Sequence, residues 1–268
     1  MRTALTIAGS DSGGGAGIQA DLKTFAAFGV YGATAITAVT AQNTEHVFDV
    51  WPLPTEVVAA QIDAVAADID IDAVKTGMLA SSAIVEVVAA AVTRWRLANL
   101  VVDPVMVAKS GDRLIAGEAI AHLKERLLPL ATLVTPNRPE AEALAGMTID
   151  NLDDARAAAR RIQALGAAAV VIKGGHFEGE MLVNLVFDGS DFHELTTERI
   201  RSRHTHGTGC TFASATAALL ARGLGVVEAV QGATEYVAGA VRHGLEVGHG
   251  HGPLDHFWRG APAAGERP

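Results

Sequence analysis

The sequence predicts a three-layer α/β fold in which a mostly parallel sheet lies between two layers of helices. Two observations support this prediction. Short runs of β-branched residues alternate with Ala-rich helical patterns along almost the whole chain, and these runs are mostly apolar. Strands without polar alternation are typical of parallel sheets that are covered on both faces by helices. No linker or repeat divides the chain, so we expect one domain over residues 1–259 and a disordered tail over residues 260–268.

The expected elements follow one another in this alternating order. Strands are predicted at residues 5–8, 35–39, 73–75, 100–102, 133–135 and 170–173. Helices are predicted at residues 16–28, 55–67, 81–95, 151–165, 211–222 and 226–245. The exception is a hairpin signal, in which apolar runs at 182–187 and 192–195 flank Asp188-Gly189-Ser190-Asp191. This hairpin predicts an antiparallel edge to the sheet.

Composition restricts the classes of function. The formal net charge is -9 and no basic run occurs, which disfavours a nucleic-acid reader. No stretch reaches the ~20 apolar residues of a membrane helix, and the first residues are too short an apolar run for a signal peptide. The single cysteine, Cys210, leaves no internal disulfide and fits a reducing compartment. We therefore expect a cytoplasmic protein without nucleic-acid or membrane partners.

Residues 9–17 form a glycine-rich segment between the first predicted strand and a helix. Ligands of parallel α/β sheets bind at this edge, beyond the carboxyl ends of the strands. The glycines match neither the P-loop nor the G-x-G-x-x-G dinucleotide pattern. The segment is therefore either a flexible turn or a backbone wall that a flat ligand can approach closely, since glycine has no Cβ.

The turn Gly207-Thr208-Gly209-Cys210 precedes an Ala-rich helix and is the sharper signal. The first amides of a helix lack intrahelical partners and carry the positive end of its dipole, so they can hold an anion. Such a site can stabilise a phosphoryl group in transit. A cysteine at this helix start is expected to have a lowered pKa and to accept a proton. The alternative is a glycine-bent helix start with an ordinary buried cysteine.

Several further motifs occur in a characteristic order. They span residues 8–21, 41–44, 75–79, 103–106, 109–111, 135–137, 173–176 and 206–211. Together they resemble the hydroxymethylpyrimidine/phosphomethylpyrimidine kinases of thiamin biosynthesis, which are ribokinase-like vitamin kinases. The resemblance covers roughly residues 4–257.

This resemblance implies a ribokinase-like fold without a separate lid domain, and a homodimer. It implies two reactions that use ATP and Mg²⁺. In these, 4-amino-5-hydroxymethyl-2-methylpyrimidine becomes first its monophosphate and then its diphosphate.

The resemblance also implies roles for individual residues. The catalytic turn would comprise Gly207, Thr208, Gly209 and Cys210, and the pyrimidine pocket Ala16, Asp21, Thr40, Gln42, Met78 and Val105. ATP and its phosphates would be bound by Lys173, Asn137 and Lys109, and Mg²⁺ by Glu140 and Asp103. These roles are chemically reasonable, since an amide matches an aminopyrimidine edge and Mg²⁺ prefers oxygen ligands.

Three other functions remain open at this stage. A pyridoxal or pyridoxine kinase could use the same scaffold, although some of these carry a second flap cysteine where this chain has Ala108. A non-catalytic vitamin-binding protein would not need Cys210 and Lys173 together. A dinucleotide oxidoreductase lacks its fingerprint glycines here. His249, His251 and His256 resemble the ordinary terminal segment of the kinase family, so we do not expect a metal site there.

Overall fold

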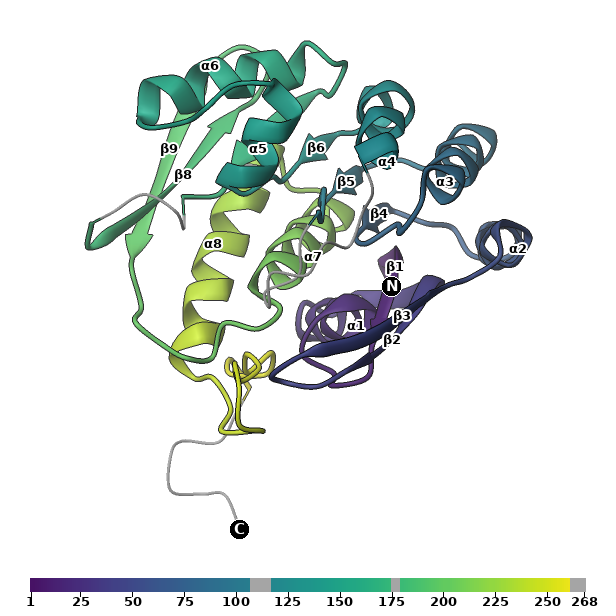
Figure 1. The fold of residues 1–268 in the computed structure, drawn as a ribbon, viewed down its shortest axis with the longest axis horizontal. Helices are drawn as coiled ribbons and strands as arrows, with labels where there is room; N and C mark the ends of the chain where they lie inside the picture. Colours follow the sequence, from purple (N-terminus) through teal and green to yellow (C-terminus); the bar gives the residue numbers. More distant parts are fainter. Residues whose placement is uncertain (107–116, 175–178, 261–268) are drawn as a thin grey trace.

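A nine-stranded sheet forms the centre of the protein, in the order β3-β2-β1-β4-β5-β6-β7-β8-β9 (Figure 1). The computed structural model describes residues 1–106, 117–174 and 179–260. The strands are β1 (Thr3–Asp11), β2 (Tyr31–Gln42), β3 (Val47–Pro52), β4 (Ala73–Thr76), β5 (Leu100–Val102), β6 (Leu133–Val134), β7 (Ala169–Ile172), β8 (Met181–Phe187) and β9 (Phe192–Glu198). The six strands that lie next to one another in the order β2-β1-β4-β5-β6-β7 are parallel. Strand β3 at one edge, and β8 and β9 at the other, run antiparallel to their neighbours.

Helices cover both faces of this sheet (Figure 1). The helices α1 (Gly17–Ala27), α7 (Thr208–Ala221) and α8 (Val226–Arg242) lie on one face. The other face is covered by α2 (Thr55–Ala66), α3 (Ser82–Trp95), α4 (Gly117–His122), α5 (Arg138–Ala145) and α6 (Leu152–Gln163). A π-helical turn, Leu123–Leu127, and a 3-10 turn, Leu128–Leu130, continue α4. The predicted α/β fold is therefore confirmed.

Each central strand sends alternate side chains into two separate cores. In β5, Leu100 and Val102 join the core under α2 to α6, while Val101 joins the core under α1, α7 and α8. This is the period of two that a strand imposes, and it explains why β5 contains no polar position. Both faces of β5 are buried, so an apolar residue is needed at each of its steps.

Helix α7 is buried on all sides. Every residue from Thr211 to Ala221 is buried, and most of them are alanines or other small residues. The sheet residues of this core include Ala4, Ala73 and Ala169, which are also short and let the helix approach closely. A helix without a polar face belongs inside a protein. The first residues of α7, from Thr208 to Cys210, are only partly buried, so the positive end of its dipole opens toward the cavity that they line.

The structure differs from the predicted elements in several places; for example, α4 and α5 are helices that were not predicted, and β2 is longer than the predicted strand at 35–39. Strand β3 forms a second antiparallel edge that was not predicted, because its residues are largely exposed and carry no alternating pattern. Helix α7 begins at Thr208, before the predicted residue 211, because Gly207 serves as its N-cap with φ +82°. Residues 261–268 of the predicted tail lie outside the described residues. None of the described helices has the length and hydropathy to span a membrane.

Candidate active site at the N-terminus of the buried helix

A cavity of about 900 Å³ lies at the carboxyl edge of the sheet, beside the N-terminus of α7. Most of the predicted site residues line it, namely Ala16, Thr40, Gln42, Met78, Asp103, Val105, Asn137, Glu140, Lys173, Gly207, Thr208, Gly209 and Cys210. Among the described residues, one predicted site residue, Asp21, does not. Lys109 lies outside the described residues, and so does Ala108. Asp21 is fully buried and is not among the lining residues. The cavity has the usual size of a small-molecule site.

Gly207 brings the two glycine segments into direct contact. A Cβ atom on Gly207 would lie 1.8 Å from the carbonyl oxygen of Gly15, so no other residue fits between these loops. The first intrahelical bond of α7 runs from Thr211 N to the Gly207 oxygen, 2.9 Å. The amides of Gly209 and Cys210 come before this bond and have no intrahelical acceptor. Amides of this kind can bind an anion, and the anion site that the sequence predicts at this turn stays a prediction.

Cys210 lies at this helix start, but its predicted lowered pKa is wrong. Burial raises the pKa of the thiol to about 11, and the charges of Asp21 and Asp103 raise it further. Lys75 and the backbone N–H of Gly17 act in the opposite direction but do not compensate. The helix dipole favours a thiolate. At this position burial is the largest influence on the pKa of the thiol, and it disfavours the thiolate.

A buried ion pair between Lys75 and Asp21 supports the floor of the cavity. Lys75 Nζ lies 2.9 Å from Asp21 Oδ2, and both side chains are 0% exposed. Thr6 Oγ1 donates to the same carboxylate oxygen at 2.6 Å, and Ser214 Oγ donates to the other at 2.5 Å. Asp21 was predicted to contact the pyrimidine, and the structure places it beneath the cavity instead. Lys75, which lines the cavity, had no predicted role because a lysine inside a strand pattern gives no clear signal.

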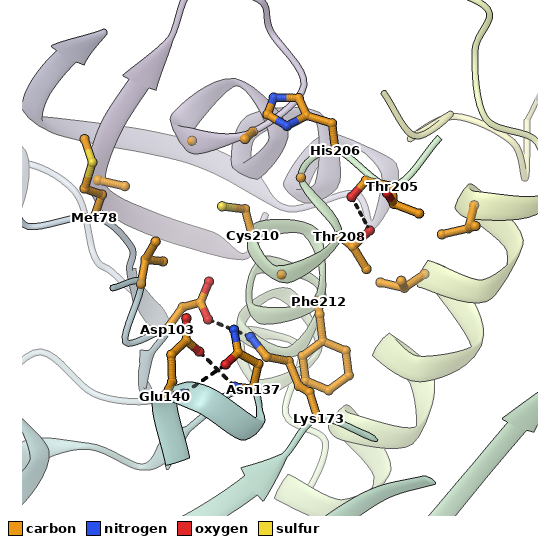
Figure 2. A pocket seen from close by; sticks show the side chains of 18 of the residues that line it. Met78, Asp103, Asn137, Glu140, Lys173, Thr205, His206, Thr208, Cys210 and Phe212 are labelled. Carbon is orange, nitrogen blue, oxygen red and sulfur yellow. Dashed lines mark hydrogen bonds and ion pairs between the residues drawn. The ribbon is translucent and has the colours of Figure 1, made fainter. Parts of the chain in front are cut away.

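Lys173 and Asp103 form a second ion pair, which faces the N-terminus of α7. Lys173 Nζ lies 2.9 Å from Asp103 Oδ1, which also accepts from Thr135 Oγ1 at 3.1 Å. A Cβ atom on Gly209 would lie 3.5 Å from Lys173 Nζ and 3.8 Å from Asp103 Oδ2. Figure 2 shows these groups below the start of α7. A lysine, a carboxylate and free helix amides therefore meet in one space.

Asn137 and Glu140 form a capping box at the start of α5. Glu140 N donates to Asn137 Oδ1 at 3.0 Å, and Asn137 N donates to Glu140 Oε2 at 2.8 Å. Burial raises the pKa of Glu140 to about 7; Lys173 opposes this rise and Asp103 adds to it. The N-x-x-E motif thus has a structural role of its own. The box also holds the Glu140 carboxyl beside Asp103 and Lys173 (Figure 2).

The end of the cavity near β2 combines a polar amide with apolar walls. Gln42 lies at the end of β2, and its Oε1 atom is 3.2 Å from Thr40 Oγ1. At Gly9, which also lines the cavity, the Met78 methyl group packs so closely that a Cβ there would lie 2.5 Å from it. Ala16 and Val105 complete this end. It can hold a flat ring with one hydrogen-bonding edge.

The other end of the cavity carries no sequence motif and combines a group of apolar side chains with polar ones such as Asn184, Thr197 and Arg199. Phe212 of α7, Val237 and Val241 of α8, and Leu182 and Ile200 line it. Figure 2 shows Phe212 between α7 and α8, away from Met78. These residues come from elements far apart in the sequence, so only the fold identifies them. The lining also includes His206, which sequence reasoning left without a role.

The C-terminal histidines have no common centre. His256 is buried, and its Nε2 lies 3.0 Å from Thr211 Oγ1. Burial lowers its pKa to about 4, and the charge of Lys23 adds to this. The backbone N–H of His251 donates to the Thr44 carbonyl at 2.9 Å. Among the described residues, no group of three or more His, Cys, Asp or Glu side chains is placed to hold a metal ion.

This fold and site define a small-molecule kinase of the ribokinase-like vitamin kinase type. The profile of the phosphomethylpyrimidine kinase family matches residues 11–255, and the chain belongs to that family. The hydroxymethylpyrimidine/phosphomethylpyrimidine kinase of Bacillus subtilis is 52% identical over 255 residues, which cover 95% of this chain and 94% of that protein. The predicted family and the predicted kinase class are confirmed.

Two further comparisons involve a longer relative and a solved structure. The thiamine biosynthesis bifunctional protein of Geobacter sulfurreducens is 52% identical over 253 residues, and this chain spans 52% of its length. The pyridoxal kinase from Staphylococcus aureus, in complex with AMP-PCP and pyridoxal, matches with a TM-score of 0.90 and 38% identity. That match covers 97% of this chain and 95% of the pyridoxal kinase.

Proposed function

We propose that this kinase transfers the γ-phosphoryl group of ATP to the hydroxymethyl group of 4-amino-5-hydroxymethyl-2-methylpyrimidine, and then a second one to the monophosphate. One observation carries the proposal. Gly209, whose amide comes before the first intrahelical bond of α7, lies beside Lys173 and Asp103 in the cavity, where a Cβ on it would be 3.5 Å from Lys173 Nζ. A phosphoryl group at this point could reach both ends of the cavity. The names of the relatives support the same reaction.

The two ends of the cavity suit the two substrates. The Gln42 amide offers a donor and an acceptor to an aminopyrimidine edge, and the wall of Met78 and Gly9 accommodates a flat ring. The apolar side chains at the end near Phe212 suit the adenine of ATP. With adenine at that end, the triphosphate would lie across the N-terminus of α7, within reach of Lys173 and Asn137, which line the same cavity.

The carboxylates in the middle of the cavity fit a magnesium ion. Mg²⁺ is usually held by one or two carboxylates, by substrate phosphates and by waters, so no closed protein cage is needed. Glu140 already accepts hydrogen bonds from the amides of Asn137 and Met106, so it would act through water. Asp103 Oδ2 lies close to the start of α7, since a Cβ on Gly209 would be 3.8 Å from it, and it could contact the ion directly. When bound, the ion would neutralise charge on the β- and γ-phosphates.

In the first transfer, the hydroxymethyl oxygen bonds to the γ-phosphorus while the bond to the β-phosphate oxygen breaks and ADP leaves. The hydroxyl proton passes to a phosphate oxygen of the product. Cys210 aligns the hydroxyl as a neutral thiol, since its pKa of about 11 leaves almost no thiolate at pH 7. In the second transfer the acceptor is a phosphate oxygen that is ionised near neutral pH, so no base is required. An aligning thiol therefore serves both steps.

Product analysis tests this function. After incubation with the hydroxymethylpyrimidine and excess ATP and Mg²⁺, we expect monophosphate first and diphosphate later. The alternative substrate, pyridoxal, is suggested by the 0.90 TM-score match to a pyridoxal kinase. A kcat/KM for pyridoxal above that for the hydroxymethylpyrimidine would overturn the substrate assignment. Turnover of neither compound would refute both.

We further propose that the enzyme is a homodimer built on the outer side of β2 and β3. Val39 and Trp51 are directly paired across these strands, and so lie on one face, yet they are 42% and 53% exposed. Phe48 and Tyr31 are exposed on the same two strands. A second copy of the chain would cover this apolar surface.

A further inference from the structure

His206 lies between the two glycine segments of the site. It directly precedes Gly207 and is 8% exposed. A Cβ atom on Gly15 would lie 2.3 Å from its ring, so the ring is packed tightly against the first segment. Its Nε2 atom lies 2.8 Å from Asp11 Oδ2 and 3.4 Å from Gln42 Nε2. One ring nitrogen thus faces both a carboxylate and the amide assigned to the substrate.

The partners of Asp11 determine where the His206 hydrogen lies. Asp11 Oδ1 accepts from Gly13 N at 2.8 Å, and Oδ2 accepts from Gly15 N at 3.1 Å and Ala16 N at 2.8 Å. Burial by itself would raise the pKa of Asp11, but His206 and these amides outweigh it and lower the pKa. An ionised carboxylate only accepts hydrogen bonds. His206 Nε2 must therefore carry a hydrogen and donate it.

A protonated Nε2 has no lone pair to offer the Gln42 NH₂ group. The situation on the other side of the amide is similar. Thr40 Oγ1 lies 2.9 Å from the Ser10 carbonyl oxygen and 3.2 Å from Gln42 Oε1. Ser10 O only accepts and is the nearer atom, so the single Thr40 hydrogen goes there. Gln42 Oε1 then faces a lone pair, while its NH₂ group faces a donor.

A half-turn of the Gln42 amide resolves both conflicts, because it exchanges the oxygen and the NH₂ group and leaves their positions almost unchanged. We propose that His206, held by Asp11, is a positioning residue that turns the Gln42 oxygen toward itself and the NH₂ group toward Thr40, and thereby sets specificity for an amine next to a ring nitrogen. This deepens the proposed function and rests on it. The Gln42 oxygen then shares the His206 Nε2 hydrogen with Asp11 in a bifurcated bond, in which Asp11 Oδ2 is the nearer acceptor at 2.8 Å and the Gln42 position lies at 3.4 Å. The NH₂ group donates to Thr40 Oγ1.

The orientation matters because each amide group keeps one free position for the ligand. The Gln42 oxygen retains a lone pair for the amine, and its nitrogen retains a hydrogen for the ring nitrogen. A 4-oxo analogue carries a carbonyl beside a ring N–H, which is the reverse pattern. Binding it would require the amide to turn back, against both His206 and Thr40. The site should therefore reject the oxo analogue.

The test compares kcat/KM for the aminopyrimidine and its 4-oxo analogue in the wild-type enzyme, His206→Leu and His206→Gln. Leucine removes the donor, whereas glutamine keeps an N–H near the position of Nε2. We expect His206→Leu to reduce the preference for the amine about tenfold, mainly through KM, the equivalent of one net hydrogen bond. His206→Gln should restore most of it. An unchanged preference in His206→Leu, or equal losses in both variants, would overturn the proposal.

A measurement on the wild-type enzyme covers the case in which a variant does not fold. The ¹⁵N shift of His206 Nε2 at pH 8 should be that of a nitrogen bearing hydrogen, and a shift typical of a bare nitrogen would refute the proposal. This result does not depend on the substrate. A wild-type enzyme that fails to phosphorylate the aminopyrimidine, yet shows a hydrogen on Nε2, would refute the proposed function and leave the Gln42 orientation standing.

Discussion

At the scale of single residues, the proton of Cys210 distinguishes two mechanisms. A thiol with a pKa of about 11 that served as the base would make kcat rise about tenfold per pH unit below that value. A thiol that only aligns the hydroxyl makes kcat nearly independent of pH. We expect the second behaviour, measured as kcat at saturating substrate between pH 7 and pH 9. A slope near one would show that Cys210 takes the proton.

Substitution of Cys210 adds a second measurement. Cys210→Ala should lower kcat about a hundredfold, the usual cost of a misplaced reacting group, while calorimetry finds nearly unchanged pyrimidine binding. Cys210→Ser offers an O–H that can align the substrate, but a serine hydroxyl is almost never ionised near neutral pH and so cannot act as the base. If Cys210 only aligns the hydroxyl, this variant should retain most of the activity that Cys210→Ala loses. Equal losses in both variants would argue against alignment.

The pair of Lys75 and Asp21 should matter for stability more than any surface ion pair. Lys75→Met leaves the Asp21 charge without a cation in a site from which water is excluded. We expect a loss of about 3–5 kcal/mol in the free energy of unfolding, measured in urea. The matched control is Arg2→Met, which breaks an ion pair whose arginine is 59% exposed and should cost within about 1 kcal/mol.

A double variant tests whether charge is the cause. Lys75→Met combined with Asp21→Leu removes both charges at once and should be less destabilised than the sum of the single variants. Additive losses would mean that Lys75 contributes through the packing of its stem and not through its charge.

At the scale of the elements, Gly207 connects the start of α7 to the first glycine segment. Gly207→Ala would introduce a Cβ 1.8 Å from Gly15 O, at a residue with φ +82°. The control is Gly223→Ala, where φ is +90° but no atom lies within 4 Å. Both variants should lose about 1 kcal/mol from the left-handed backbone. Only Gly207→Ala should also lose most of kcat, because its clash displaces the amides that hold the phosphoryl group.

The same elements show what the sequence could predict. Buried strands such as β5 are readable because both faces require apolar residues, and the turn before α7 is readable because glycines flank a helix start. The end of the cavity near Phe212 and Val237 could not be predicted, since its apolar part is formed by helix faces that resemble ordinary core. The rise in the Cys210 pKa was also missed, because it depends on how deeply the fold buries the sulfur. His206 was missed for a similar reason, since its partners Asp11 and Gln42 are distant in the sequence.

At the scale of the whole molecule, the proposed dimer accounts for the apolar side chains that are exposed on β2 and β3. Val39 and Trp51 each expose apolar area whose burial is worth about 2 kcal/mol per side chain. Val39→Lys should therefore weaken the proposed dimer at least a hundredfold, as measured by analytical ultracentrifugation over a range of concentrations. The control is Met181→Lys, since Met181 is 50% exposed on β8, near the opposite edge of the sheet. It should leave the association constant unchanged.

The same substitution connects assembly with substrate recognition. Val39 is followed on β2 by Thr40 and Gln42, which form the polar end of the cavity. A partner that holds Val39 would also restrain the strand end that presents these two side chains, so loss of the dimer should raise KM for the pyrimidine more than it lowers kcat. A Val39→Lys enzyme that is monomeric but keeps the wild-type KM would show that each subunit orders its own site. A Val39→Lys enzyme that remains dimeric would place the interface elsewhere.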